Sequence, residues 1–187
     1  MSKSYFFIIL SIGFYAVSAC TTAKSLHDVF QSHCLTTPIE HHIDLRVIDG
    51  DKVSACPPDE EEGCPYSGNI GQTYQAAHPD LNLDGRSDAV IRYFGSGYGN
   101  TENVDYLVLA QCKDGTYISV FNGKLSELHA PVRIKNAWPD INAMLVCSSK
   151  SSKNNNNARI TLRFNHKSFQ YMPTPSASLD NSCLTSP

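Results

Sequence analysis

Short alternating segments joined by Asp-Gly turns are the feature that most restricts how this chain can fold. Residues 43–48 alternate apolar and polar side chains and run into Asp49-Gly50-Asp51, a turn sequence typical of antiparallel hairpins. Lys113-Asp114-Gly115 stands between two further segments of the same kind. No alternating helix pattern interrupts this series. The expected strands are residues 43–48, 104–110, 116–121, 141–147, 159–164 and 168–172.

This pattern predicts a mostly β fold, an antiparallel meander or small sandwich. One short N-terminal helix is expected within residues 23–34, because its apolar side chains recur at helical spacing. Those side chains are Leu26, Val29, Phe30 and Cys34. The chain then divides into residues 20–40 (tether and short helix), 41–172 (β domain) and 173–187 (an irregular tail rich in Pro and Ser).

Residues 80–88 carry oxygen-bearing side chains at alternating positions, with glycine in sixth place. A hard cation such as Ca²⁺ takes six to eight oxygen ligands, and glycine permits the sharp turn that wraps them around the ion. The expected ligands are Asp80, Asn82, Asp84, the carbonyl of Arg86 and Asp88. An Asp/Asn/Gly-rich turn without metal is the alternative, since these residues favour turns in any case.

The loop does not fit an EF-hand. Its twelfth position is Ile91 in place of a bidentate Glu, and residues 89–94 read as an extended segment and not as a helix. The loop resembles the D-x-N-x-D-G-x-x-D sequence of FG-GAP and VCBS-type calcium repeats, in which a strand follows the loop. The resemblance covers about fifteen residues and implies a structural Ca²⁺ with Asp88 as a direct ligand. A full propeller of such repeats needs several four-stranded blades, which one loop cannot supply.

The first nineteen residues have the pattern of a secretion signal. Lys3 supplies the positive start, residues 5–17 form a short apolar stretch, and small residues precede Cys20. Two forms of processing are open. Val17-Ser18-Ala19-Cys20 resembles a bacterial lipobox, which implies lipidation of Cys20, whereas ordinary cleavage after Ala19 would release a soluble protein.

Cysteine parity favours the lipidated form. The chain has seven cysteines, and using Cys20 for lipid leaves an even number, which suggests up to three disulfides in an exported chain. The six remaining are Cys34, Cys56, Cys64, Cys112, Cys147 and Cys183. Cys56 and Cys64 are expected to pair because they are close in sequence, and Cys112 with Cys147 because their strands are expected to be neighbours.

The charge balance restricts the partners. The chain has a formal net charge of -3, which becomes -4 when cleavage of the signal peptide removes Lys3. A mildly acidic protein is not expected to bind nucleic acid or anionic membrane by electrostatics. We expect an exported protein, either lipid-anchored on the periplasmic side of a bacterial outer membrane or soluble in the periplasm, with membrane contact only through the lipid.

Two segments are candidates for partner binding. Asp59, Glu60, Glu61 and Glu62 lie between Cys56 and Cys64, so a disulfide there would display four acids on a stapled loop suited to a basic protein. A solvated surface loop is the plainer interpretation. Tyr98 lies in a glycine-rich segment that is either a flexible connection or a recognition loop.

No spacing typical of a catalytic or zinc site is present, and the neighbouring His41 and His42 would point to opposite faces of a strand. We therefore expect a non-enzymatic, calcium-stabilised envelope lipoprotein that binds a protein. The more specific form of this hypothesis is an inhibitor or immunity protein against a basic cell-wall-degrading enzyme. The alternatives are a structural envelope lipoprotein without an enzyme partner, and an unrecognised hydrolase that uses calcium or a histidine.

Overall fold

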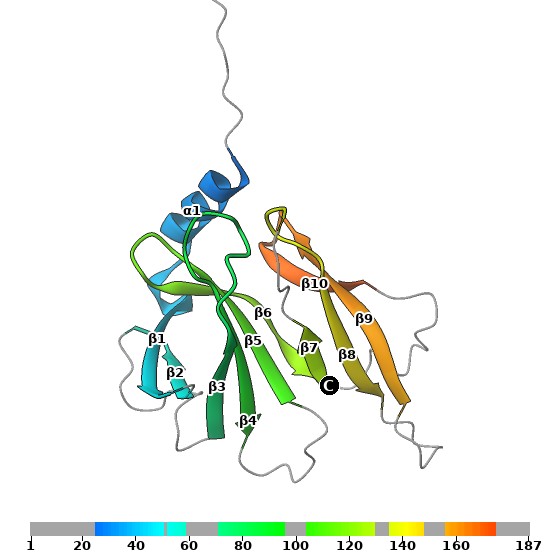
Figure 1. Cartoon of the computed structure of the whole chain (residues 1–187). Coiled ribbons are helices and arrows are strands. Elements are labelled where there is room, and N and C mark those ends of the chain that lie inside the picture. The colour runs from blue at the N-terminus through cyan, green and yellow to red at the C-terminus, as the bar shows by residue number, and fades with distance from the viewer. Residues whose placement is uncertain are drawn as a thin grey trace, which may run out of the picture.

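The computed structural model describes residues 25–50, 52–58, 71–95, 104–129, 135–147 and 156–174. Strands β1 to β6 form a closed barrel in sequence order, and a second sheet has the order β10-β9-β8-β7 (Figure 1). One α-helix, α1 (Leu26–Thr36), and a 3₁₀ turn, η1 (Ile39–His41), precede them. The strands are β1 (His42–Asp49), β2 (Lys52–Cys56), β3 (Gly71–Ala77), β4 (Ala89–Gly95), β5 (Val104–Gln111), β6 (Tyr117–Leu125), β7 (Glu127–His129), β8 (Ile141–Cys147), β9 (Asn156–Asn165) and β10 (Gln170–Thr174).

The expected fold class is confirmed: the protein is mostly β, with antiparallel strands and a single short α-helix in the described part of the chain. Within each sheet, strands that are consecutive in sequence pair with each other, as in a meander, and the chain passes from one sheet to the other between β6 and β7. Gly50 and Gly115 adopt φ of +53° and +92° in the turns after β1 and β5. Only glycine enters this left-handed region at little cost, which is why Asp-Gly marked both hairpins correctly.

The barrel closes through two short seams. β1 pairs with β6 only at His42↔Ile118 and Ile43↔Tyr117, and β2 pairs with β3 at Lys52↔Tyr74. The interior is filled by small and branched side chains, as a narrow barrel requires. They are Val53, Ala55, Ala89, Ile91, Leu107 and Leu109, with Ile43, Leu45 and Tyr117 partly buried against them.

A second core lies between the outer face of the barrel, the sheet β7–β10 and α1. β5 contributes to both cores, because Leu107 and Leu109 face the barrel interior while Val108 and Ala110 face outward. Trp138 is buried here, stacked on Phe164 with ring centroids 3.8 Å apart and in edge contact with Phe30 at 5.1 Å. Large flat rings fill the space between a sheet and a helix and stabilise their packing.

α1 begins at the N-cap Ser25, whose hydroxyl oxygen accepts the Asp28 backbone N–H at 3.4 Å. Phe30 and Cys34 are buried as the helical pattern predicts, whereas Leu26 and Val29 are exposed. The polar Gln31 is buried in their place. No helix in the described ranges is both long and apolar enough to span a membrane.

The structure differs from the expected one in the start of the tail and in the number of strands. The irregular tail was expected to begin at Pro173, but Pro173 and Thr174 belong to β10 and pair with Leu162 and Thr161 of β9. β10 is an edge strand, where proline is tolerated because its missing N–H faces away from the ladder. β2, β3 and β7 were not among the expected strands, although the hairpin turn predicted at residues 49–51 does lead into β2.

Candidate functional site

The loop at residues 80–88 joins β3 to β4 and lies beside α1 (Figure 1). The Asp80 carboxylate stabilises the turn of this loop. It accepts hydrogen bonds from the backbone N–H groups of Asp84 at 3.1 Å and of Gly85 at 3.0 Å. The Asp84 N–H also lies 3.2 Å from Asn82 Oδ1. Gly85 adopts a φ of +82°, which explains glycine in the sixth position. The loop is therefore folded back on its own oxygen-bearing side chains.

Asp88 closes the loop at the start of β4 and is completely buried. Its carboxylate accepts the Leu81 N–H at 2.7 Å and the Gln111 N–H at 2.8 Å. Burial is the largest cause that raises the pKa of Asp88 to about 7; the negative Asp84 and Asp80 also raise it, and the two backbone hydrogen bonds lower it. Asp88 thus links the loop to β5 at the cost of burying a carboxyl group.

Asp84 faces the molecule's interior. One carboxylate oxygen accepts hydrogen bonds from Gln31 Nε2 at 2.7 Å and from Asn82 Nδ2 at 3.2 Å. Arg86 Nη1 lies 3.6 Å from the same oxygen. Three carboxylates and one guanidinium give residues 80–88 a formal charge of -2. The negative charge of the loop is therefore only partly compensated by protein groups.

The donor chemistry of the loop fits Ca²⁺, because Asp80, Asn82, Asp84 and Asp88 all offer oxygen and the loop holds them within one turn of chain. The three carboxylates do not form a group whose ligand atoms all lie within 4.8 Å of one another. Coordination by all three would therefore require side-chain rotations.

Gln31 joins α1 to this loop and to the β5–β6 turn. Its Nε2 donates to Asp84 and, at 3.2 Å, to the Gln111 carbonyl, while its Oε1 accepts the Lys113 N–H at 2.9 Å. All the hydrogen-bonding capacity of the side-chain amide except one acceptor lone pair is used. Sequence reasoning missed Gln31 because its partners lie more than fifty residues away.

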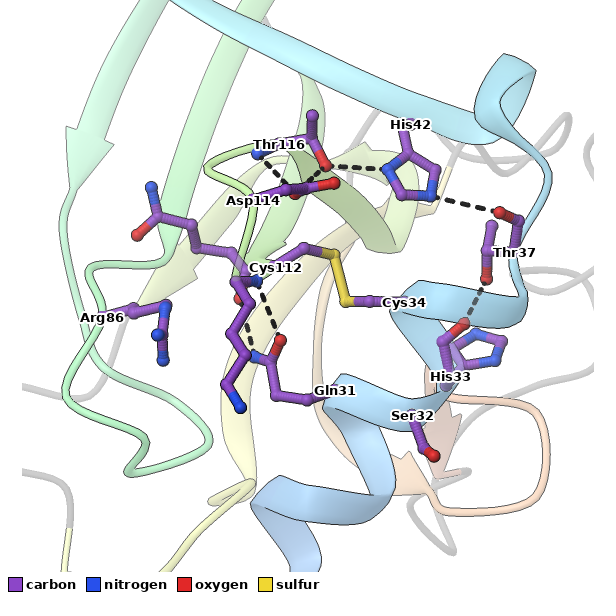
Figure 2. Close-up of a disulfide and its surroundings, with 12 residues drawn as sticks. Gln31, Ser32, His33, Cys34, Thr37, His42, Arg86, Cys112, Asp114 and Thr116 are labelled. Carbon is purple, nitrogen blue, oxygen red and sulfur yellow. Dashed lines mark hydrogen bonds between the residues drawn. A yellow bond between two sulfur atoms is a disulfide. The ribbon is translucent and has the colours of Figure 1, made fainter.

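A disulfide between Cys34 and Cys112 fixes α1 to the same turn, with a Cα–Cα distance of 5.9 Å (Figure 2). The expected Cys112–Cys147 pair is therefore wrong. It assumed neighbouring strands, but β8 pairs with β7 and β9 and belongs to the other sheet. Cys56 is disulfide-bonded as well.

His42 lies next to this disulfide and is buried. Its Nδ1 is 2.7 Å from the Thr116 hydroxyl and its Nε2 is 3.2 Å from the Thr37 carbonyl. The Thr116 hydroxyl also lies 2.7 Å from Asp114 Oδ1. The hydrogen bond from the Thr116 hydroxyl is the main cause that holds the pKa of Asp114 below its ordinary value. The Thr116 backbone N–H and the charge of the nearby His42 also lower this pKa, against the opposing effect of burial.

His42, Cys112 and Asp114 are the one group in the described ranges whose potential metal-ligating atoms lie within 4.8 Å of one another. They line a cavity of about 270 Å³ together with Cys34, Leu35 and Ile39 of α1 and η1. In the sequence, His41 and His42 stand out only as an adjacent pair. His41 is exposed at the end of η1, whereas His42 opens β1 and points inward.

The other predicted site residues lie outside the described ranges. They are Cys20, Asp59, Glu60, Glu61, Glu62, Cys64, Tyr98 and Cys183. Cys147 ends β8, but its side chain is not described.

Comparisons of the chain with protein-family models, with curated proteins and with solved structures find no match.

Proposed function

We propose that this protein is a calcium-stabilised, non-catalytic binding module of a bacterial cell envelope. The observation that carries the calcium part is the setting of Asp88, a completely buried carboxyl group beside Asp84 and Asp80. Burying like charges together destabilises a fold unless a cation neutralises them. The oxygen-only donor set favours a hard cation such as Ca²⁺ over softer metals.

In this proposal Asp80, Asn82, Asp84 and Asp88 hold the ion, with the Arg86 carbonyl as a further ligand. The ion supplies positive charge and no reaction chemistry. An ion that binds only the folded state stabilises it by about 2.7 kcal/mol at one hundred times its dissociation constant. The loop contacts α1 through Gln31, β5 through Gln111, and the second core through the Trp138 N–H, which donates to the Leu81 carbonyl. Calcium would therefore stabilise the whole domain.

Thermal melting of the mature protein with added Ca²⁺ and with chelator tests this proposal. We expect calcium to raise the melting temperature clearly, and Asp84→Ala to remove most of the rise. Asp49→Ala is the matched control, because Asp49 is an exposed acid at the end of β1. An equal rise with Mg²⁺, or none with Ca²⁺, would reject calcium at this loop.

The envelope part of the proposal is supported by the secretion signal and by Cys20 in its lipobox-like setting. Metabolic labelling with a radioactive fatty acid should label the wild-type protein and leave Cys20→Ala unlabelled. Label on both proteins would contradict lipidation at Cys20.

The binding part is supported by the four acids at residues 59–62, which suit a basic partner such as a cell-wall-degrading enzyme. Reversing the charge of all four should abolish binding of such an enzyme while the calcium-dependent melting temperature stays unchanged. If binding persists, these acids are not the interface. If no basic envelope enzyme binds the wild-type protein, a structural envelope lipoprotein becomes the better description.

A further inference from the structure

Four residues with metal-binding side chains meet where α1 crosses the β5–β6 turn. Cys34 comes from α1, His42 from the start of β1, and Cys112 and Asp114 from the turn (Figure 2). One potential ligand atom from each of His42, Cys112 and Asp114 lies within 4.8 Å of the others, and Cys34 is bonded to Cys112. None of the four belongs to the loop at residues 80–88.

The hydrogen bonds of His42 orient it as a metal ligand. Its Nε2 faces the Thr37 carbonyl, which can only accept, so Nε2 carries the proton and a neutral ring leaves Nδ1 bare. Metal-binding histidines commonly donate their second ring N–H to a carbonyl, which fixes the tautomer and the ring orientation. Nδ1 is the nitrogen that faces Thr116 and, beyond it, Asp114 (Figure 2).

His42 and Asp114 meet at the Thr116 hydroxyl. Its oxygen lies 2.7 Å from His42 Nδ1 and donates to Asp114 Oδ1 at 2.7 Å. Positive charge is favourable beside the Asp114 carboxylate, and either a proton on Nδ1 or a metal ion supplies it. The two sulfurs lie close to the same point.

We propose that reduction of the Cys34–Cys112 disulfide converts this cluster into a zinc site with Cys34, Cys112, His42 and Asp114 as ligands. A dithiol reductant supplies two electrons and two protons, breaks the S–S bond and leaves as its own cyclic disulfide. The two thiols then release their protons to solvent as Zn²⁺ binds the thiolates. Two thiolates and one carboxylate around Zn²⁺ give a net charge of -1.

The geometry requires only small adjustments. Zinc ligands stand about 2.0 to 2.3 Å from the metal, so in a tetrahedron they lie roughly 3.3 to 3.8 Å from one another. The potential ligand atoms of His42, Cys112 and Asp114 lie within 4.8 Å of one another, so movements on the order of 1 Å bring them to this spacing. Three separate elements hold the four ligands. Both cysteines line the cavity of about 270 Å³, which offers the metal and the dithiol a route to the sulfurs.

The consequence for the fold is that α1 stays fastened to the barrel in either redox state. The oxidised protein uses the disulfide, and the reduced protein uses the metal. Zinc should therefore stabilise the reduced chain and leave the oxidised chain unaffected.

Cobalt substitution tests the site, because Co²⁺ bound tetrahedrally by thiolates absorbs visible and near-ultraviolet light characteristically. The mature protein, fully reduced by a dithiol that is then removed without oxygen, should bind one Co²⁺ with these bands, and Zn²⁺ should displace it. The oxidised protein should show no bands. Cys34→Ser and Cys112→Ser should each abolish them, while Cys56→Ser should retain them.

The two nitrogen and oxygen ligands are tested separately. His42→Gln and Asp114→Asn should each weaken cobalt affinity at least tenfold, and His41→Gln, the exposed neighbour, should not change it. Unchanged affinity in His42→Gln, or bands that survive in Cys34→Ser, would overturn the proposal. If reduction unfolds the chain, cobalt must restore the circular dichroism of the oxidised protein, and failure to restore it would also overturn the proposal.

Discussion

Asp88 shows how a single residue can set the stability of this domain. Its carboxylate is buried, its pKa is raised to about 7, and two backbone N–H groups bind its oxygens. An ordinary Asp in the unfolded chain titrates near 4. The folded protein therefore binds one more proton than the unfolded chain between these two values.

This difference predicts an unusual pH dependence. With divalent cations removed, stability should fall as pH rises from about 4 to about 7, because folding must then take up a proton from solution or bury the ionised carboxylate. The total loss should be on the order of 3 to 4 kcal/mol. Urea unfolding at pH 5 and pH 8, with and without calcium, measures it. Calcium should flatten the curve, and a rise in cation-free stability over this range would contradict the prediction.

Gln31 is the second residue whose replacement should strongly lower the stability of the folded protein. Gln31→Leu should destabilise the protein by about 2 to 3 kcal/mol, because it removes the side-chain amide that binds the Lys113 N–H, the Gln111 carbonyl and the Asp84 carboxylate. Gln31→Glu should cost more, since it places a second carboxylate against Asp84. Ser32→Ala, an exposed change one residue further along α1, is the control and should be near neutral. Equal stability of the Leu and Glu variants would argue against the role of charge here.

At the scale of elements, α1 depends on its attachments. A helix of eleven residues is marginal on its own in water. It is held by Phe30 against Trp138, by Gln31 and by the disulfide, all of which reach partners far away in sequence.

Replacing both Cys34 and Cys112 by Ala should therefore loosen α1 before the sheets. The chain-entropy model gives about 4.5 kcal/mol for a disulfide that spans 78 residues, and we expect a measured loss of about 2 to 4 kcal/mol. Amide hydrogen exchange should accelerate in α1 more than in β5. Uniform acceleration over both elements would indicate that the disulfide stabilises the domain as a whole.

The elements also show what the sequence could predict. Strong alternation beside an Asp-Gly turn located β1, β5 and β6, since the signal is local. β3 has the small and polar sequence GQTYQAA, which carries no such alternation. The loop residues were found because they are neighbours in the chain. The contacts of Gln31, the cluster around His42 and the Cys34–Cys112 disulfide could not be found in this way, because residues far apart in the chain meet there only when α1 docks on the barrel.

At the scale of the whole molecule, the two cores share one wall. β5 is buried on both faces, with Leu109 in the barrel core and Val108 in the second core. A disturbance of either core therefore reaches the other through the same strand.

This shared wall predicts a single cooperative transition. Leu109→Ala in the barrel and Leu162→Ala in the second core should each cost about 2 to 5 kcal/mol, and neither should split the unfolding curve. Differential scanning calorimetry checks this, because the calorimetric and van't Hoff enthalpies agree for a two-state transition. A separate low-temperature peak in Leu162→Ala would show that the sheet β7–β10 unfolds independently.

Trp138 gives the molecule one more property. It is the only tryptophan in the chain, and it is buried where α1, the second sheet and the β3–β4 loop meet. Its indole is therefore the dominant intrinsic fluorophore, and it stands at the junction on which cation binding, reduction and helix release would all act. Emission from the folded protein should be blue-shifted relative to free tryptophan. A change in its wavelength or intensity would report each of these events in the unlabelled protein.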